Sequence, residues 1–365
     1  MAPIRHPYQP NYGVAPGKLV EEYLEILDIS ARELARRCGR SAKLMIEIIS
    51  GKASIEPETA LQLERVLEMD AEIWLNMEAA YRLHLAKADE AARLLNETEW
   101  ASRFPISEMR KLGVLKASSD PANIVRQLLA FFGAGSVDAC RERFAELAAV
   151  SYRHSQSFKS AEEPLLVWLR LGEIKAAGIK CAEFDRTSFL EALREIRRLT
   201  TRTIGVFLPE IERLCARTGV AFVVVKPFPG TALSGISRWL SPRKALIQQS
   251  MRHMANDHFW FTFFHEAAHL LLHSRKSVFL DGANYGSAEP NEEEEANSWA
   301  TNFLVPQAAL QKFIAVFDYS PGSIVEFARQ HGIAPGIVVG QLQKRGAIHF
   351  SQFNKLKERY QWGDS

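Results

Sequence analysis

Two histidines and a glutamate in the second half of the chain have the spacing HExxH: His265, Glu266 and His269. Residues four apart lie on the same face of a helix, so both imidazoles project to one side and can bind one metal ion. The glutamate between them leans toward the same ion and can hold a water molecule. The spacing predicts a hydrolytic zinc centre, in which zinc lowers the pKa of water toward about 7 and Glu266 passes its proton to the leaving amine.

The residues on either side of this pattern are strongly apolar. Residues 260–264 read WFTFF and residues 270–272 read LLL, so the helix is apolar on nearly every side and is expected to be buried. Two histidines and a glutamate in a buried helix need strong compensation, which a bound Zn²⁺ supplies. The alternative is a pair of core histidines whose rings hydrogen-bond to backbone carbonyls.

The third metal ligand must come from another segment, because a catalytic zinc usually binds three protein side chains and keeps one position open. His273 follows His265 by two helical turns, which is about 12 Å along the axis, so it cannot reach the same ion. We expect His273 to interact with the carboxyl end of its own helix.

The acidic run at residues 291–297 is the expected source of the third ligand. In a helix, Glu294 and Glu295 point away from the apolar face, while Glu292 flanks it. Glu293 also flanks this face, and we favour it because Asn297, one turn later, can hydrogen-bond a ligand. Glu292 is the alternative. The apolar face consists of Ala296, Trp299, Ala300, Phe303 and Leu304.

Peptide hydrolysis also requires a group that stabilises the oxyanion. An extended peptide commonly pairs with a sheet edge, which a strand near residues 235–240 could provide. The candidates for the oxyanion group, which the sequence leaves equal, are Tyr285, Arg238, Arg252 and His253.

The N-terminal region is expected to form short amphipathic helices, the first of them beginning at Pro16. Ser30 and Glu33 form a capping box, in which the serine caps a new helix and the glutamate reaches back to it. Gly39 ends that helix, and Ser41 can cap the next. Two helices joined by a short glycine-containing turn are the plan of a helix-turn-helix.

Positive charge in this region is concentrated on the helix-turn-helix. Residues 14–95 have a net charge of −4, whereas residues 30–52 have six Lys or Arg against two Glu, a net charge of +4. Contacts to DNA phosphates need such a local excess. Leu44 and Ile46 offer no bidentate base contacts, so the alternative is a dimerisation or partner-docking domain. If the module binds DNA, we expect a symmetric homodimer. The candidate DNA contacts are Arg32, Arg40, Ser41, Lys43 and Lys52.

Strand patterns are confined to the second half of the chain. Residues 220–225 are a β-branched run, and shorter strands are expected at 233–240 and 244–250. Helices over 257–273 and 292–306 follow. We therefore expect an α+β fold: an all-α helix-turn-helix domain, a helical middle segment and a zincin-like metallopeptidase domain with a small sheet. The expected divisions are a flexible tail at 1–13, the helix-turn-helix domain at 14–96, the middle segment at 97–200, the metallopeptidase domain at 201–312 and a helical extension at 313–365.

Composition and charge exclude several other classes of protein. The 365 residues include 45 Lys or Arg and 43 Asp or Glu, so no global field draws the chain to nucleic acid or lipid. The four cysteines form no CxxC pair, which argues against a disulfide framework and a thiolate metal site. Residues 1–13 lack the apolar core of a signal peptide, and the longest apolar stretch is interrupted by the HExxH residues. We expect a cytoplasmic protein without a membrane segment.

Several further motifs surround the HExxH pattern. Gly219-Val220 opens a strand, Ser234-Gly235 is followed by Arg238-Trp239, and Glu293-x-x-Ala296-Asn297 precedes an apolar run that ends at Pro306. With these motifs, residues from about 204 to 306 resemble the ImmA/IrrE class of zinc metallopeptidases. The resemblance supports Glu293 as the third ligand. Because members of this class cleave a repressor or a similar regulatory protein, it implies a narrow protein substrate.

The N-terminal region carries a second resemblance. Its motifs are Val14-Ala15-Pro16-Gly17, Glu33-Leu34-Ala35, Ile48-Ile49-x-Gly51-Lys52 and the run WLNMEAAY at residues 74–81. Residues 14 to about 86 resemble the helix-turn-helix of HigA-type antitoxins, although Ala31 stands where that family usually has Gln or Arg.

Two functional hypotheses follow from the sequence. The first is a cytoplasmic zinc metallo-endopeptidase that cleaves a specific regulatory protein, a repressor or an antitoxin-like protein, and uses the helix-turn-helix to target DNA or a partner. The second is a DNA-binding transcriptional regulator or antitoxin in which the zinc domain senses a signal or cleaves only its own chain.

Overall fold

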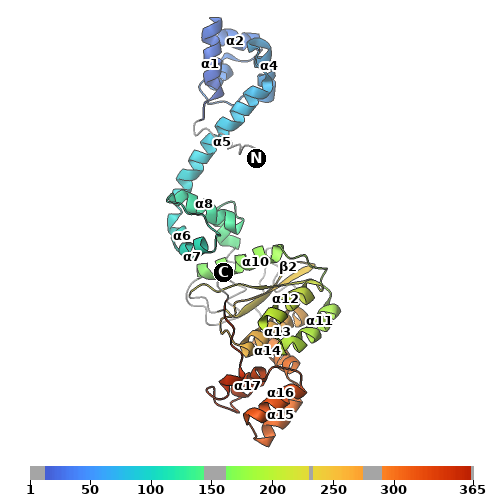
Figure 1. Cartoon of the computed structure of the whole chain (residues 1–365). Coiled ribbons are helices and arrows are strands. Elements are labelled where there is room, and N and C mark those ends of the chain that lie inside the picture. The colour runs from blue at the N-terminus through green and yellow to red at the C-terminus, as the bar shows by residue number, and fades with distance from the viewer. Residues whose placement is uncertain (1–12, 144–161, 230–232, 274–289, 363–365) are drawn as a thin grey trace, which may run out of the picture. The chain divides into compact units, whose positions relative to one another are not determined.

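The structure, a computed structural model, describes residues 13–143, 162–229, 233–273 and 290–362 (Figure 1). Tyr285 and residues 1–12 of the tail expected at residues 1–13 lie outside these ranges. Helices and one small sheet make up the described chain, so the expected α+β fold class is confirmed. In the described ranges, none of the helices combines the length and apolar character needed to cross a membrane.

The chain divides into two compact units, each described here by itself. The first contains the residues up to 101 together with 117–127, and the second contains 102–116 together with the residues from 128 onward. The finer domain boundaries expected from the sequence stay a prediction. The helices of the first unit include α1 (Pro16–Leu27), α2 (Ala31–Arg37), α3 (Ala42–Ile49), α4 (Pro57–Leu67) and α5 (Ala71–Leu95).

Local capping sets the helix-turn-helix pair α2 and α3. The Ser30 Oγ accepts a hydrogen bond from the Glu33 N–H at 3.2 Å, and the Ser41 Oγ accepts one from the Leu44 N–H at 3.1 Å. Gly39 between the helices has φ of +64°, a conformation that glycine adopts without strain. The expected capping box is half correct, because the Glu33 carboxylate accepts hydrogen bonds from Arg36 and Arg37.

The first unit has its own apolar core. The side chains of Leu34, Met45, Ile48 and Trp74 are fully or almost fully buried in it. The expectation of only short helices was wrong for α5, which runs for 25 residues.

The second unit is built around a three-stranded sheet of β1 (Val220–Val224), β2 (Gly235–Ser241) and β3 (Lys244–Gln249). The strand order is β1-β3-β2, with β1 parallel and β2 antiparallel to β3, so β2 is an edge strand. Two helices, α6 (Thr98–Ser102) and α8 (Pro121–Phe132), lie at the division between the units. The helices of the second unit include α7 (Ile106–Lys111), α10 (Glu162–Ala177), α11 (Arg186–Arg198), α12 (Ile204–Ala216), α13 (Asn256–Leu272), α14 (Pro290–Leu304), α15 (Gln307–Val316), α16 (Pro321–Gln330) and α17 (Pro335–Lys344).

Helices cover both faces of this sheet, with α10 on one side and α12 and α13 on the other (Figure 1). The α13 face contains most of the apolar core, including Phe222 of β1 packed against Phe263 of α13 at 5.3 Å between ring centroids. The α10 face is held by polar contacts as well. Gln248 of β3 donates to the Trp168 carbonyl at 2.7 Å, and Arg238 of β2 donates to the Leu169 carbonyl at 2.9 Å.

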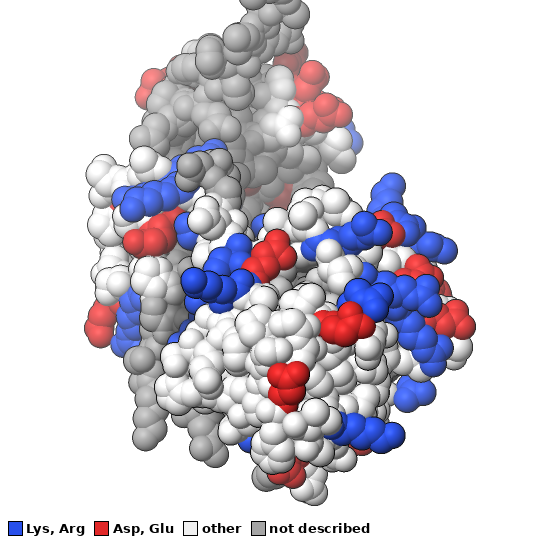
Figure 2. All heavy atoms as spheres, turned by 60° about the horizontal axis from the view of Figure 1, so that its bottom comes forward, with Lys and Arg blue, Asp and Glu red and all other residues white. Residues whose placement is uncertain are grey.

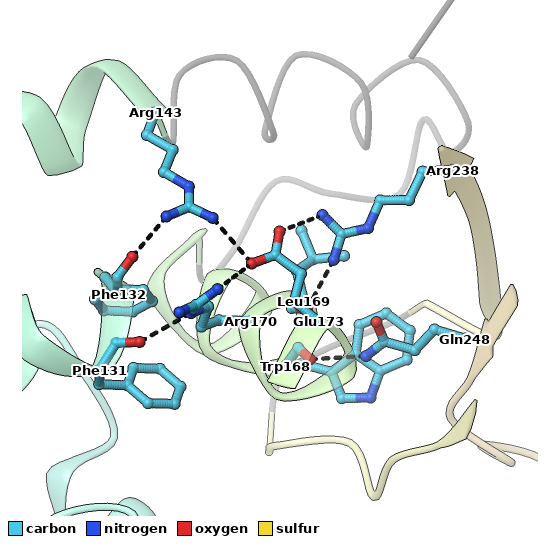
Figure 3. A network of polar contacts seen from close by, with 9 residues as sticks. All are labelled: Phe131, Phe132, Arg143, Trp168, Leu169, Arg170, Glu173, Arg238 and Gln248. Atoms are coloured by element: carbon cyan, nitrogen blue, oxygen red, sulfur yellow. Dashed lines mark hydrogen bonds and ion pairs between the residues drawn. The ribbon is translucent and has the colours of Figure 1, made fainter. Parts of the chain in front are cut away.

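Charged side chains form a network at this α10 face (Figure 3). Glu173 of α10 accepts hydrogen bonds from Arg238 at 2.8 Å, Arg170 at 2.6 Å and Arg143 at 3.0 Å. Only 4% of the Arg238 side chain is exposed, so its charge depends on Glu173 for compensation.

Candidate metal centre

Helix α13 places the HExxH residues at the edge of the apolar core, where the two histidines are partly buried. Its apolar side chains, among them Trp260, Phe263 and Phe264, are fully buried. The helix is therefore fixed by packing along most of its circumference, as the apolar flanks predicted. Glu266 is only 7% exposed, and His265 and His269 are partly buried.

Helix α14 brings Glu293 to these histidines from a separate segment. The Nε2 atoms of His265 and His269 are 3.1 Å apart. The Glu293 Oε2 lies 3.4 Å from the His265 Nε2, and its Oε1 lies 3.3 Å from the His269 Nε2. In the part of the chain that the structure describes, these three residues are the His, Cys, Asp or Glu group able to hold a metal ion.

The spacing of these donor atoms suits zinc. Zinc binds histidine and carboxylate ligands at about 2.0–2.1 Å in tetrahedral geometry, which puts neighbouring ligand atoms about 3.3 Å apart. The three measured separations, 3.1, 3.3 and 3.4 Å, agree with this value. Two imidazoles and one carboxylate are also a donor set that catalytic zinc sites use.

His273 departs from its expected position. Its backbone N–H donates to the His269 carbonyl at the end of α13, but its ring turns toward the His269 ring, with 2.9 Å between their Nδ1 atoms. On the far side, the His273 Nε2 lies 3.4 Å from the Glu295 Oε2. Sequence reasoning missed this contact, although the spacing of four residues between His269 and His273 placed both rings on one helix face.

These contacts determine which ring nitrogen of His269 and of His273 carries a proton. Burial, together with the neighbouring His269, lowers the pKa of His273, so its ring is neutral at pH 7 and can accept a hydrogen bond. If the His269 Nε2 faces a metal, its Nδ1 carries the proton and donates to His273. The His273 proton is then on Nε2, toward Glu295.

The environment of His265 is strongly acidic. Burial alone would lower the pKa of this imidazole, but the hydrogen bond to Glu293 and the charge of Glu266, with a hydrogen bond to Asn297, outweigh burial and raise it. A cation is thus favoured at this position. The expected role of Asn297 as an outer hydrogen-bond partner of the ligands stays a prediction.

Glu266 lies directly against the edge strand β2. A Cβ added to Gly235 would be 2.6 Å from the Thr262 Cγ2 and 3.2 Å from the Glu266 Oε1. The absence of a side chain at Gly235 therefore lets the backbone of β2 approach the glutamate closely.

The candidates for oxyanion stabilisation separate in the structure. Arg238 was a wrong candidate, because its guanidinium lies on the α10 face of β2 and binds Glu173 (Figure 3). Arg252 and His253 line a small cavity that Thr262 of α13 also lines, so both stay candidates. Tyr285 is outside the described residues.

The side chains predicted to contact DNA differ in whether they already make contacts within the protein. Arg40 donates to Gln62 at 2.7 Å and to Glu58 at 3.0 Å, which ties the turn between α2 and α3 to α4. The Ser41 hydroxyl caps α3. Lys43 lies 3.9 Å from Glu47 and remains 85% exposed, and Arg32 and Lys52 are exposed.

Comparison with known proteins adds information on both units. Residues 223–339 match the family model of the IrrE N-terminal-like domain, Peptidase_M78. Over 78 residues the chain is 38% identical to Virulence-associated protein I of Dichelobacter nodosus, which covers 21% of this chain and 72% of that protein. Over 80 residues it is 34% identical to the uncharacterized HTH-type transcriptional regulator YddM of Escherichia coli K12, covering 22% of this chain and 85% of that protein.

A solved structure is also similar to this chain. It is an addiction module antidote protein of the HigA family from Coxiella burnetii, with 30% sequence identity and a TM-score of 0.22. The match covers 23% of this chain and 94% of that one.

Proposed function

Because this chain belongs to the HigA-like helix-turn-helix regulators through its N-terminal region and carries an IrrE N-terminal-like peptidase domain at residues 223–339, we propose that it is a zinc-dependent endopeptidase acting on a specific regulatory protein. The observation that carries the proposal is the convergence of the His265, His269 and Glu293 donor atoms at separations of 3.1 to 3.4 Å. These residues would hold the zinc.

The residues around this centre have distinct tasks. Zinc, when bound, supplies a Lewis acid that polarises the substrate carbonyl. Glu266 accepts a proton from the attacking water and delivers it to the leaving amine. Among the described strands β2 pairs only with β3, so its outer edge, which lies against Glu266, could pair with an extended peptide. Arg252 or His253 would stabilise the oxyanion.

The substitution Glu266→Gln tests this function. It removes the general base but no zinc ligand, so we expect about one zinc per chain in both proteins and a loss of peptidase activity of at least about 100-fold. The matched control is Glu294→Gln, an exposed residue on α14, which should retain activity. The substrate can be identified by mass spectrometry of proteins that co-purify with the inactive variant. A folded chain that binds no zinc would refute the proposal.

We further propose that the helix-turn-helix targets this activity, with DNA as the candidate partner. The carrying observation is the charge of Arg32, Lys43 and Lys52, which are exposed on or next to α2 and α3. A gel shift with DNA from upstream of the gene should weaken in Arg32→Ala and Lys43→Ala. Lys87→Ala, an exposed lysine on α5, is the control. A salt-sensitive shift that neither substitution changes would contradict the proposed DNA-binding face, and the absence of any shift would favour docking to a protein partner.

The alternative function, a regulator whose zinc domain only senses a signal or cleaves its own chain, is tested with the same variant. If the domain cleaves itself, the purified wild-type chain should carry a new terminus that Glu266→Gln lacks. If it only senses a signal, both chains should stay intact and no cleaved partner should appear.

A further inference from the structure

A cavity of about 280 Å³ lies between α13, α14 and α17. The residues that line it include Phe261 of α13, Thr301 and Leu304 of α14 and Ile337 of α17. The surface over the C-terminal helices is largely uncharged, with Lys and Arg side chains gathered toward its margins (Figure 2).

The cavity and the metal centre both lie along helices α13 and α14. Phe261 precedes His265 by one turn of α13, and the two rings lie 6.0 Å apart with 30° between their planes. On α14, Thr301 follows Glu293 by two turns. Four residues of an α-helix span about 6 Å, and an extended peptide advances about 3.3–3.6 Å per residue. The end of the cavity at Phe261 is therefore within reach of a residue one or two positions from a bond held at the metal centre, whereas the end at Thr301 lies about 12 Å along α14 from Glu293.

The walls of the cavity suit a large apolar group. Phe261, Leu304 and Ile337 supply apolar surface, and Phe350 at its edge is 67% exposed. A cavity of about 150 Å³ is enough to hold benzene, so 280 Å³ accommodates a side chain the size of Phe or Leu. Burying such a side chain gives a binding free energy that a glycine or alanine in its place would lack.

The charges at the cavity favour an acidic neighbour. Lys344 and Arg345 line it and are exposed. Among the described lining residues, the one carboxylate is that of Asp257, and it pairs with Lys357 at 2.6 Å. The rim thus keeps an excess of positive charge that a carboxylate on the ligand would neutralise.

We propose that this cavity is the side-chain pocket of the endopeptidase: it receives a large apolar residue of the substrate next to the scissile bond, while Lys344 and Arg345 favour an acidic residue beyond it. The inference rests on the proposed function, since it needs a peptide held at the metal centre. It defines the substrate segment by its chemistry, a bulky apolar residue followed by a carboxylate.

Hydroxamates test this pocket without knowledge of the natural substrate, because the hydroxamate group binds zinc directly. The first probe, acetohydroxamate, carries only the zinc-binding group, and the second is a succinyl hydroxamate joined to glycine. The third probe adds a 2-benzyl group to the second. The fourth is the third with glycinamide in place of glycine. Isothermal titration calorimetry on the zinc-loaded chain gives their affinities. We expect the benzyl group to tighten binding at least tenfold, and the free carboxylate of glycine to bind at least threefold tighter than glycinamide.

Variants that fill the cavity or reverse a charge at its rim test whether these gains in affinity come from the pocket. Thr301→Trp fills the cavity and should abolish the benzyl gain while acetohydroxamate binds as before. Ile337→Phe serves the same purpose if the first variant misfolds. Ser298→Trp, an exposed position on α14, is the matched control. Lys344→Glu should remove the preference for the carboxylate, and Lys312→Glu, an exposed lysine of α15, should not.

The outcomes separate the pocket from the metal centre. If acetohydroxamate fails to bind the zinc-loaded chain, the metal centre and the inference that rests on it are both refuted. If acetohydroxamate binds but the benzyl group adds nothing, or its gain survives both cavity-filling variants, the pocket alone is refuted. A carboxylate preference that persists in Lys344→Glu would refute the charged part of the proposal.

Discussion

At the scale of single residues, His273 is expected to support zinc binding without touching the metal. When the His269 Nε2 binds a metal, the His273 ring accepts a hydrogen bond from the His269 Nδ1–H, and such outer hydrogen bonds contribute about 10- to 100-fold to metal affinity. We predict a loss of this size in His273→Ala, measured by competition with a chromophoric chelator. His273→Gln, whose amide oxygen can accept the same bond, should recover most of the affinity.

The control for this prediction is His349→Ala, which removes an exposed histidine that contacts Ser351. Its zinc affinity should equal that of the unchanged protein. If His273→Ala also binds zinc with full affinity, the proton order inferred for the two rings is wrong.

At the scale of secondary-structure elements, Glu173 is expected to anchor α10 to the sheet. Its carboxylate compensates three guanidinium groups, and Arg238 among them is almost fully buried. Removing one partner of a buried ion pair costs about 3–5 kcal/mol, since a buried charge is left uncompensated. We predict a destabilisation of this size in Glu173→Gln, measured by urea unfolding. Glu163→Gln, on the same helix, should change the free energy of unfolding by less than about 0.5 kcal/mol.

The same network predicts how the stability of the protein changes as the pH falls. Burial raises the pKa of the Glu173 carboxyl, but Arg238, Arg170 and Arg143 together lower it below its ordinary value. The stabilisation from the charged carboxylate is therefore complete above the unfolded-state pKa of about 4.3 and is lost as the pH falls toward the lower folded-state pKa. Unfolding midpoints of the wild type and Glu173→Gln should converge in that range. Midpoints that stay equally far apart at low pH would contradict this.

Elements with a strong local pattern were predictable from the sequence. The apolar flanks of HExxH indicated α13, and the position of Glu293 on α14 followed from the apolar face of that helix. Contacts between distant segments were not predictable. Arg238 and Glu173 are 65 residues apart, so no local pattern showed that the arginine was already engaged. For the ring of His273 the sequence indicated only the end of its own helix as a partner, because Glu295, the carboxylate that this ring contacts, lies on another helix.

At the scale of the whole molecule, the two units have separate apolar cores and should unfold in separate transitions. One core contains Ile48 and Trp74, and the other contains α13 with the candidate metal centre. We expect zinc to bind only the folded form of the second unit, and at a thousandfold excess over its dissociation constant it should add about 4 kcal/mol to that unit alone. Calorimetry should therefore show one transition that zinc moves upward and one that it leaves in place.

Two substitutions identify these transitions. Ile48→Ala, which creates a cavity in the first core, should lower only the zinc-independent transition. His265→Ala should abolish the upward shift caused by zinc. A single transition that responds to both substitutions would show that the units unfold together.

The close approach of Gly235 to Glu266 has a consequence for how such a protein can change over evolutionary time. Adding one methyl group at this position would crowd Thr262 and the glutamate, while the three metal-binding side chains on α13 and α14 keep their places. We therefore expect Gly235→Ala, which needs a single base change in a glycine codon, to displace Thr262 or Glu266 and to lower the proposed peptidase activity more than it lowers zinc affinity.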